Sequence, residues 1–340
     1  VVRSPGSWIC GDQNYSLEGE RALLRFEIGP QDVLPQYLFS RRSALAAVHL
    51  LAIDRDGAMR QTSMPAGELR SALRGGYFKA PLPGVTRDTQ QIVVAFDLAS
   101  HQMTLERAYL SASDLAIGPD LVRSLLLLAT LAGMLSMPLI FNAAFYRILR
   151  EPFVLWHSML TISLLLTILV SSGLAVVLFD PPAMTLSWMT TVIFGLTVAS
   201  GAMFTHSFIE PGCMHPLLRR ALLWCAAWAI FLSASHAAFP FVGRSVQSTL
   251  YTGAFAPVVV VFILSVADAL RRGSRAAKFQ AVGYTPMILA GLVRLVTGVV
   301  PSLQSNDAML LFYAGCVFEV LFTTLGVADR FMTIKRQRDQ

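Results

Sequence analysis

Charged residues are scarce in this sequence, where they make up 14% of 340 residues against about 25% in an ordinary soluble domain. The mean hydropathy is high, at +0.57. The scarcity is confined to the second part of the chain: residues 1–120 hold 12 basic and 13 acidic residues, whereas residues 121–340 hold 15 basic and 8 acidic ones. This composition does not fit a cytosolic enzyme. The positive excess lies in the apolar part, so it points to membrane topology and not to a nucleic-acid partner.

Cysteine is also rare, and no two cysteines have the spacing of a metal site. The first 120 residues contain a single cysteine, so no disulfide can form within them. The other three lie in or beside apolar runs, where a thiol behaves as a small buried hydrophobic group. The chain begins without a methionine and without an apolar leader, so we expect any signal peptide to have been removed or left out. The four cysteines are Cys10, Cys213, Cys225 and Cys316.

Several catalytic motifs found in membrane bundles are missing. The only lysines, Lys79, Lys278 and Lys335, lie outside the apolar runs, so none can hold retinal as an intramembrane Schiff base. No HExxH motif offers a zinc site, and no GxSxG motif offers a nucleophilic serine. We therefore predict no catalytic residue, no metal site and no cofactor in this chain. The histidines of the apolar runs are interpreted as polar residues bonded within a bundle (His157, His206 and His236).

The first 120 residues have the pattern of short β-strands. An Asp-Gly pair at 56–57 separates two of the strand-like segments and indicates a hairpin. Several short strands with turn residues between them are typical of a small antiparallel sandwich, which we predict for residues 1–118. The strand-like segments lie at residues 22–28, 45–53, 58–63, 91–98 and 103–110.

Aromatic residues in this part give two interpretations. They can stack on a sugar or another flat ligand, which would make the domain a sensor of a small, carbohydrate-like molecule. They can equally form the core of the sandwich. The candidate ligand-binding residues are Trp8, Tyr37, Tyr77 and Phe78, with Tyr15 beside them.

From residue 121 onward the sequence consists of long apolar runs separated by short polar or proline-rich breaks. Each run is close to or longer than the ~20 residues that a helix needs to cross a bilayer. We therefore predict an all-α bundle of seven transmembrane helices in residues 119–330. The runs cover residues 121–146, 153–179, 186–208, 218–240, 249–270, 280–300 and 308–329.

Basic residues are distributed unevenly over the breaks. Twelve lie after the first, third, fifth and seventh runs, whereas only Arg244 lies after the second, fourth or sixth. Since cytoplasmic loops carry the excess of Lys and Arg, the first set is predicted to be cytoplasmic. The sandwich is then periplasmic, and the C-terminus lies on the cytoplasmic side of a bacterial inner membrane.

Two ionisable residues lie inside predicted spans, Arg294 in the sixth and Glu319 in the seventh. A charge at this depth costs several kcal/mol unless it is paired or hydrated. We therefore expect an Arg294–Glu319 pair. It would serve either as a helix-packing contact or as a switch that opens during signalling.

The seventh run continues past the membrane boundary to Gln340. In it, Val327, Phe331 and Ile334 have the 4-and-3 spacing that opens a heptad seam. We interpret residues 331–340 as the start of a cytoplasmic coiled coil that joins two copies and leads to a further domain. The alternative is a basic membrane anchor that ends there. The predicted signal-transmitting residues are Asp329, Arg330, Phe331 and Ile334.

This order of segments resembles bacterial receptors with diverse intracellular signalling modules (7TMR-DISM). The segment 141–146 before Arg147 is similar to the Tyr-Asn-Leu stretch that closes the first helix of that family, with Phe141 at the Tyr position. Phe318-Glu319 and the run 325–330 are similar to the ending of its seventh helix. The resemblance implies that the sandwich is a shortened, jelly-roll-like ligand-sensing domain.

The family resemblance also implies an output domain after the last helix, commonly a GGDEF diguanylate cyclase. Such a domain binds GTP and Mg²⁺ and makes cyclic di-GMP. The sequence contains no GGDEF motif, because the glycine pair at residues 75–76 is followed by Tyr-Phe-Lys and not by Asp-Glu-Phe. We therefore interpret the chain as a receptor input module. The alternatives are the input module of a sensor histidine kinase, a small-molecule transporter and, third, a membrane-embedded enzyme.

Overall fold

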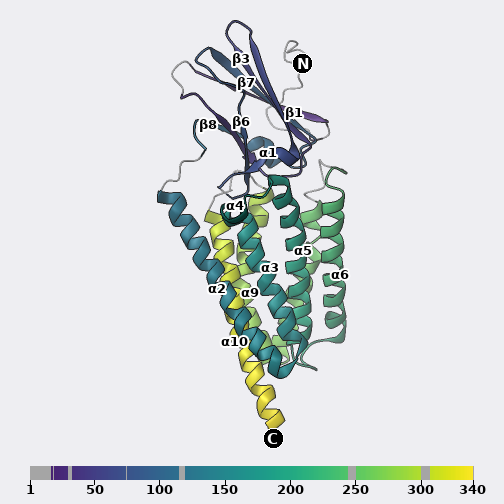
Figure 1. Ribbon diagram of the computed structural model, residues 1–340. Helices are drawn as coiled ribbons and strands as arrows, with labels where there is room; N and C mark the ends of the chain where they lie inside the picture. Colours follow the sequence, from purple (N-terminus) through teal and green to yellow (C-terminus); the bar gives the residue numbers. More distant parts are fainter. Residues whose placement is uncertain are drawn as a thin grey trace.

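A β-sandwich stands at one end of an elongated helix bundle in the computed structural model (Figure 1). The last helix extends past the bundle at the opposite end (Figure 1). We call these two ends the sandwich end and the C-terminal end. The structure describes residues 17, 19–29, 33–73, 75–114, 119–243, 250–299 and 307–339.

The sandwich consists of two four-stranded antiparallel sheets, as predicted. The first contains, in spatial order, β1 (Arg21–Glu27), β7 (Thr89–Asp97), β3 (Ala47–Asp54) and β4 (Met59–Pro65). The second contains β5 (Arg70–Ser71), β6 (Tyr77–Pro81), β2 (Tyr37–Arg41) and β8 (Tyr109–Ser111). The Asp-Gly hairpin is confirmed between β3 and β4, where Gly57 has a φ of +85°.

Alternate residues of the sheets form the sandwich core. In β3 every second residue is buried, which is the period-2 pattern of a strand with one face inward. The largest fully buried side chains of the core are Leu38, Leu50, Leu69, Phe78, Ile92 and Phe96.

One strand prediction is wrong. Residues predicted as a strand over 103–110 begin instead with the short helix α1 (Gln102–Glu106), and only β8 at their end is extended. The reason is local capping, since the His101 ring accepts a hydrogen bond from the backbone N–H of Met103 at 3.0 Å. A second short helical turn, η2 (Ala66–Glu68), follows β4.

The bundle consists of long helices that follow the predicted apolar runs. Six of them have the length and hydropathy of a membrane span, and the fifth of these spans covers Leu250–Arg271. Two bundle helices are not among these six, which were found in the described part of the chain: the six-residue α4, and α9, which packs against α10. That α9 crosses the membrane stays a prediction. The bundle helices are α2 (Pro119–Leu149), α3 (Pro152–Ser171), α4 (Leu174–Phe179), α5 (Ala183–Phe208), α6 (Pro216–Ala238), α8 (Ala256–Arg271), α9 (Arg275–Val299) and α10 (Asp307–Asp339).

The run 153–179 is not one helix, although its apolar sequence is uninterrupted. It breaks between α3 and α4, where Gly173 has a φ of +90°. A left-handed glycine ends a helix readily because it has no Cβ. The break brings backbone to the surface of the bundle at the place where the sandwich sits.

The sandwich and the bundle meet there through two glycines. A Cβ on Gly75 would lie 2.4 Å from the carbonyl oxygen of Ser171, and a Cβ on Gly173 would lie 2.3 Å from the carbonyl oxygen of Leu73. No side chain fits at either position, so the loop before β6 and the end of α3 are in direct backbone contact. Arg42 adds a hydrogen bond from Nη2 to the carbonyl oxygen of Val170 at 3.1 Å, which caps the α3 C-terminus.

A second contact joins β5 to the start of α5. The backbone N–H of Ala183 donates to the carbonyl oxygen of Leu69 at 3.0 Å, and Arg70 forms an isolated β-bridge with Pro182. The Ala183 side chain is fully buried and belongs to the hydrophobic core of the sandwich. The first residue of a membrane helix is therefore part of the core of the β-domain.

We predict that Gly75→Ala weakens the junction. The added methyl cannot fit against Ser171, and overpacking of this kind costs about 1–3 kcal/mol. Thermal unfolding of the detergent-solubilised chain, together with hydrogen exchange at residues 171–174, measures the effect. Gly67→Ala is the matched control, because nothing lies within 4 Å of a Cβ there. Equal unfolding temperatures and exchange rates for the two variants would contradict the prediction.

Candidate functional site

A cavity of about 1150 Å³ lies between the sandwich and the bundle. Its lining comes from the loop after β2, the loop before β6, α1, and the sandwich-end turns of α2, α5, α6 and α10. Small-molecule pockets usually measure about 300–1,000 Å³, so this cavity is large enough to hold a small molecule.

The charged side chains of the cavity are all basic. Among the lining residues that the structure describes there is neither an aspartate nor a glutamate. Burial, then the neighbouring charge of Arg41, lowers the pKa of Arg42 to about 10. The pKa of His101 is lowered by burial, then by Arg41 and His236. The lowered pKa keeps the His101 ring neutral at pH 7, so the positive charge of the cavity comes from its arginines. The basic lining residues are Arg41, Arg42, His101, Arg107, Arg123 and His236.

The predicted aromatic ligand residues have different surroundings. Tyr77 lines the cavity and makes an edge contact with Tyr109, at 6.1 Å between ring centroids. Tyr37 is half-buried and packs beside Phe39. Phe78 is fully buried in the sandwich core, which agrees with the interpretation of these aromatic residues as core residues. Successive residues of a strand point to opposite faces of the sheet, so next to the half-buried Tyr77 on β6 the side chain of Phe78 points into the core. Trp8 and Tyr15 lie outside the described residues.

Helix α10 begins at this cavity. Met309, Leu310 and Tyr313 from its first turns line it, and the Tyr313 hydroxyl lies 2.9 Å from Oγ of Ser171. Ser171 is also the residue whose carbonyl oxygen meets Gly75. Two contacts therefore connect the sandwich, the end of α3 and the start of α10.

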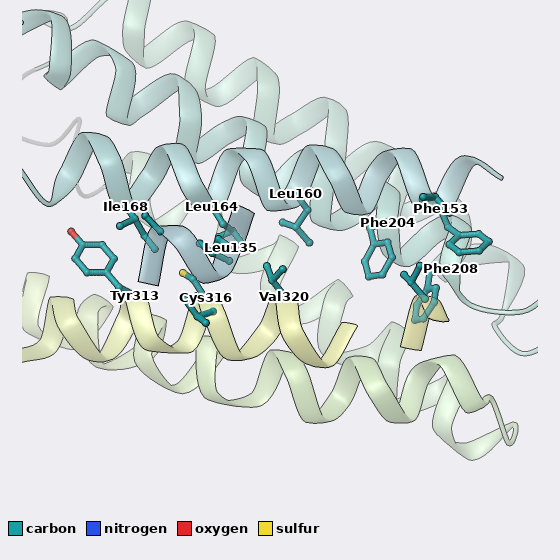
Figure 2. Close-up of a cluster of buried hydrophobic side chains, with 14 of the residues drawn as sticks. Leu135, Phe153, Leu160, Leu164, Ile168, Phe204, Phe208, Tyr313, Cys316 and Val320 are labelled. Atoms are coloured by element: carbon teal, nitrogen blue, oxygen red, sulfur yellow. The ribbon is translucent and has the colours of Figure 1, made fainter. Parts of the chain in front are cut away.

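Below the cavity, α10 packs along α3 through small and branched side chains (Figure 2). Glycines bring α10 close to α9 as well: a Cβ on Gly315 would lie 3.2 Å from the Cα of Met287. Close approach through small residues is the usual way in which membrane helices pack. Figure 2 shows Leu160, Leu164 and Ile168 of α3 facing Tyr313, Cys316 and Val320 of α10.

A buried polar chain connects α2, α3 and α10 at mid-bundle. As oriented here, Asn142 Nδ2 donates to Nδ1 of His157 at 2.8 Å, so the other ring nitrogen carries the proton. That nitrogen, Nε2, lies 2.9 Å from Oγ1 of Thr323, whose hydroxyl donates to the carbonyl oxygen of Glu319 at 2.8 Å. All four side chains are fully buried. The expectation that His157 is bonded within the bundle is confirmed.

The predicted Arg294–Glu319 pair falls partly outside the described part of the structure. The Glu319 side chain is fully buried, and neither carboxylate oxygen has a hydrogen-bond partner among the described residues. The side chain of Arg294 is not among those that the structure describes. The pair stays a prediction.

The C-terminal end of α10 is held against the bundle by its predicted signalling residues. Asp329 Oδ1 lies 2.9 Å from Nη2 of Arg275, and the Arg330 guanidinium lies 4.8 Å from the ring centroid of Phe153. Phe331 packs on Phe145, with ring centroids 4.8 Å apart.

The seam expected to join two copies is therefore occupied within one chain. Val327 is fully buried, Phe331 is 9% exposed, and Ile334 packs on the same cluster. Phe331 packs on Phe145 of α2, and Val327 and Ile334 belong to the same hydrophobic cluster, so the pairing of two copies through this seam stays a prediction. Spacing identifies a helix face and does not identify what covers it.

Several residues of this site were not found from the sequence. Arg41 and Arg107 were counted among the charges of a nearly neutral β-domain and were not predicted to line a cavity. Nothing in the sequence shows that they face the bundle. Asn142 and His157 carried a usable signal, since each is a polar side chain within an apolar run.

We predict that His157→Leu loosens α10. The substitution removes two interhelical hydrogen bonds of roughly 0.6 kcal/mol each, so unfolding should become easier by about 1 kcal/mol. Ser158→Ala is the control, because the Ser158 hydroxyl donates to the Val154 carbonyl oxygen of its own helix and, among the described residues, to no other helix. The readouts are thermal unfolding and hydrogen exchange along α10. The prediction fails if the two variants exchange alike.

Residues 124–330 match the family described as 7TM diverse intracellular signalling. The match covers more than half of the chain and extends from the first turns of α2 to Arg330 of α10. No curated protein matches the chain. The resemblance noted in the ends of the first and last apolar runs is thus confirmed over the whole bundle. The chain belongs to the 7TM diverse intracellular signalling family.

Proposed function

We propose that this chain is the input module of a transmembrane receptor, which senses a ligand at the sandwich end and controls an output domain at the C-terminal end. The observation that carries the proposal is the course of α10. This single helix begins in the lining of the cavity and extends beyond the other helices at the C-terminal end (Figure 1). Its 33 residues span about 50 Å at 1.5 Å per residue.

The contacts of α10 support a transmission role. α10 touches α3 at three levels: Tyr313 on Ser171 near the cavity, Thr323 on His157 at mid-bundle, and Arg330 on Phe153 at the C-terminal end. A ligand that moves the first turn displaces the same rigid element that carries the last turn. Packed helices shift between discrete arrangements, so such a displacement acts as a switch.

The proposed orientation places the sandwich in the periplasm and the C-terminal end of α10 in the cytoplasm of a bacterium, with the bundle in the inner membrane. It is supported by the basic residues of the breaks, twelve of which belong to the C-terminal side against Arg244 alone on the other.

Reporter fusions test this orientation. A fusion after Asp180 should give a periplasmic signal, and a fusion after Gln340 a cytoplasmic one, because the loop charges fix both sides. A fusion after Asp120 should match the one after Asp180. Cytoplasmic signal after Asp120, or periplasmic signal after Gln340, would reverse the orientation.

The proposed output is a diguanylate cyclase that continues from α10, with a sensor histidine kinase as the alternative. A cyclase of this type joins two GTP molecules and releases two pyrophosphates, so it works as a pair of domains. A coiled coil that pairs two chains would bring them together. Because Val327 and Phe331 are buried within one chain, the pairing seam would have to begin beyond them or require their release.

We predict that a full-length protein extending beyond Gln340 converts GTP to cyclic di-GMP with Mg²⁺, whereas residues 1–340 do not. The reason for the second part is that this chain has no nucleotide-binding motif in its sequence. Product analysis after incubation with GTP gives the answer. Transfer of phosphate from ATP to the protein itself, with no GTP turnover, would support the kinase alternative instead.

A further inference from the structure

Four buried oxygen atoms near the middle of the bundle have no hydrogen-bond partner among the residues that the structure describes. They are both carboxylate oxygens of Glu319 on α10, and the hydroxyl oxygen of Tyr284 and the amide oxygen of Gln280 on α9. Glu319 and Gln280 are fully buried, and Tyr284 is 4% exposed. A buried polar atom without a partner costs about 1–3 kcal/mol, and more if it is charged, so these four oxygens require an explanation.

The three side chains come together where α9 packs on α10. Gln280 and Tyr284 are four residues apart on α9, so they lie on one face of that helix. The Tyr284 hydroxyl lies beside Gln280 and within electrostatic range of Glu319. Gly283 lets the two helices approach closely at this level, since a Cβ on it would lie 3.2 Å from the carbonyl oxygen of Glu319. The four oxygens therefore belong to one cluster.

The orientation of the Gln280 amide follows from its neighbour on α5. The Thr205 hydroxyl donates its single proton to the carbonyl oxygen of Gly201 at 2.9 Å. Thr205 can therefore only accept a hydrogen bond from Gln280, so the amide nitrogen Nε2 points to Thr205 and the amide oxygen Oε1 points away from it. The cluster thus presents three acceptor oxygens, from one carboxylate and one amide, together with a phenolic hydroxyl.

A proton on Glu319 would not complete this cluster. A protonated Glu319 and the Tyr284 hydroxyl supply two donors for four oxygens, and neither group is in hydrogen-bond geometry with a described residue. Carboxylate, amide and hydroxyl oxygens are instead the ligands of hard metal cations. One carboxylate balances one positive charge, whereas a divalent ion would leave a net charge in the bundle at a cost of several kcal/mol. The charge count therefore favours a monovalent ion.

We propose that Glu319, Tyr284 and Gln280 form a binding site for Na⁺ between α9 and α10. The ion neutralises the Glu319 carboxylate and bonds to the oxygens of the other two side chains. The site goes beyond the proposed function and does not depend on it. Its position gives it a role in the bundle, because Thr323, one turn along α10, donates to the carbonyl oxygen of Glu319 and meets His157 of α3. Bound Na⁺ would tie α10 to α9 at the level where α10 is bonded to α3.

The test is equilibrium binding of radiolabelled Na⁺ to the chain in phosphatidylcholine nanodiscs, corrected with empty nanodiscs. We expect saturable binding that Glu319→Gln abolishes, because this change removes the charge that balances the ion. Tyr284→Phe and Gln280→Leu should each weaken binding about tenfold, because each removes one ligand oxygen. Asp329→Asn is the control: this carboxylate also lies on α10 but pairs with Arg275 outside the cluster, so the variant should bind like the unaltered chain.

Thermal unfolding provides a second readout and shows which variants are folded. NaCl should raise the unfolding temperature of the unaltered chain above its value in choline chloride of the same concentration, because a ligand of the folded state stabilises it. Glu319→Gln should show no such difference between the two salts. If Glu319→Gln does not fold, Tyr284→Phe decides: the proposal is overturned if this variant binds Na⁺ as tightly as Asp329→Asn does.

Competing ions and one further variant separate the alternatives. Unlabelled NaCl should displace the label, and choline chloride, whose cation is too large for a site within a packed bundle, should not. Displacement by CaCl₂ at far lower concentration than by NaCl would indicate a divalent site and overturn the assignment. If Arg294 neutralises Glu319, as the predicted pair requires, Arg294→Gln should bind Na⁺ whereas the unaltered chain should not, and the proposal is wrong.

Two other results also overturn the proposal: no saturable binding of Na⁺ to the unaltered chain, or equal binding by Glu319→Gln and Asp329→Asn. None of these measurements needs an output domain or a ligand at the sandwich end. The Na⁺ site can therefore fail while the receptor function stands, and GTP turnover in the full-length protein can fail while the site stands.

Discussion

The absence of two side chains is the constraint on which this architecture depends. At Gly75 and Gly173 the sandwich and the bundle approach with backbone against backbone, leaving room for no Cβ. The contact fixes the height of the sandwich above the helices and leaves the basic cavity beside it. The same contact includes the backbone of Ser171, and the hydroxyl of Ser171 lies within hydrogen-bond distance of the Tyr313 hydroxyl on α10. A flexible linker would let the sandwich bind a ligand without consequence for the helices, whereas a rigid junction cannot.

The bundle combines tight packing with a few buried polar contacts, and the two have different roles. Glycines and branched side chains hold α10 close to α9 and α3, which makes it a stiff element. The His157–Thr323 bond and the stacking of Arg330 on Phe153 fix its rotation, because polar and cation–π contacts have a preferred geometry that apolar contacts lack. Rotation or sliding of α10 would break these contacts together, so the helix has discrete positions available to it.

Alternation and long apolar runs predicted the two parts of the fold, because burial on one face of a strand and burial in lipid both leave a direct pattern in the sequence. The failures have a common cause. The His101 ring caps the helix Gln102–Glu106 where a strand was predicted, and Gly173 interrupts an apolar run at the place where the sandwich contacts the bundle. Each outcome depends on a neighbour distant in the sequence or on one local bond. The cavity could not be predicted for the same reason, since its arginines and its apolar lining residues come from segments that only the fold brings together.

Ala183 has a consequence for how the protein is made. Its side chain completes the core of the sandwich, yet it follows α2, α3 and α4 in the chain. The β-domain is synthesised first but cannot close its core until three later helices have been placed and α5 has begun. Contacts this distant in sequence form slowly and leave apolar surface open in the meantime. The sandwich core is therefore complete only after the first membrane helices have assembled. A chain with a misplaced early helix would keep this core incomplete and its β-domain sensitive to proteases.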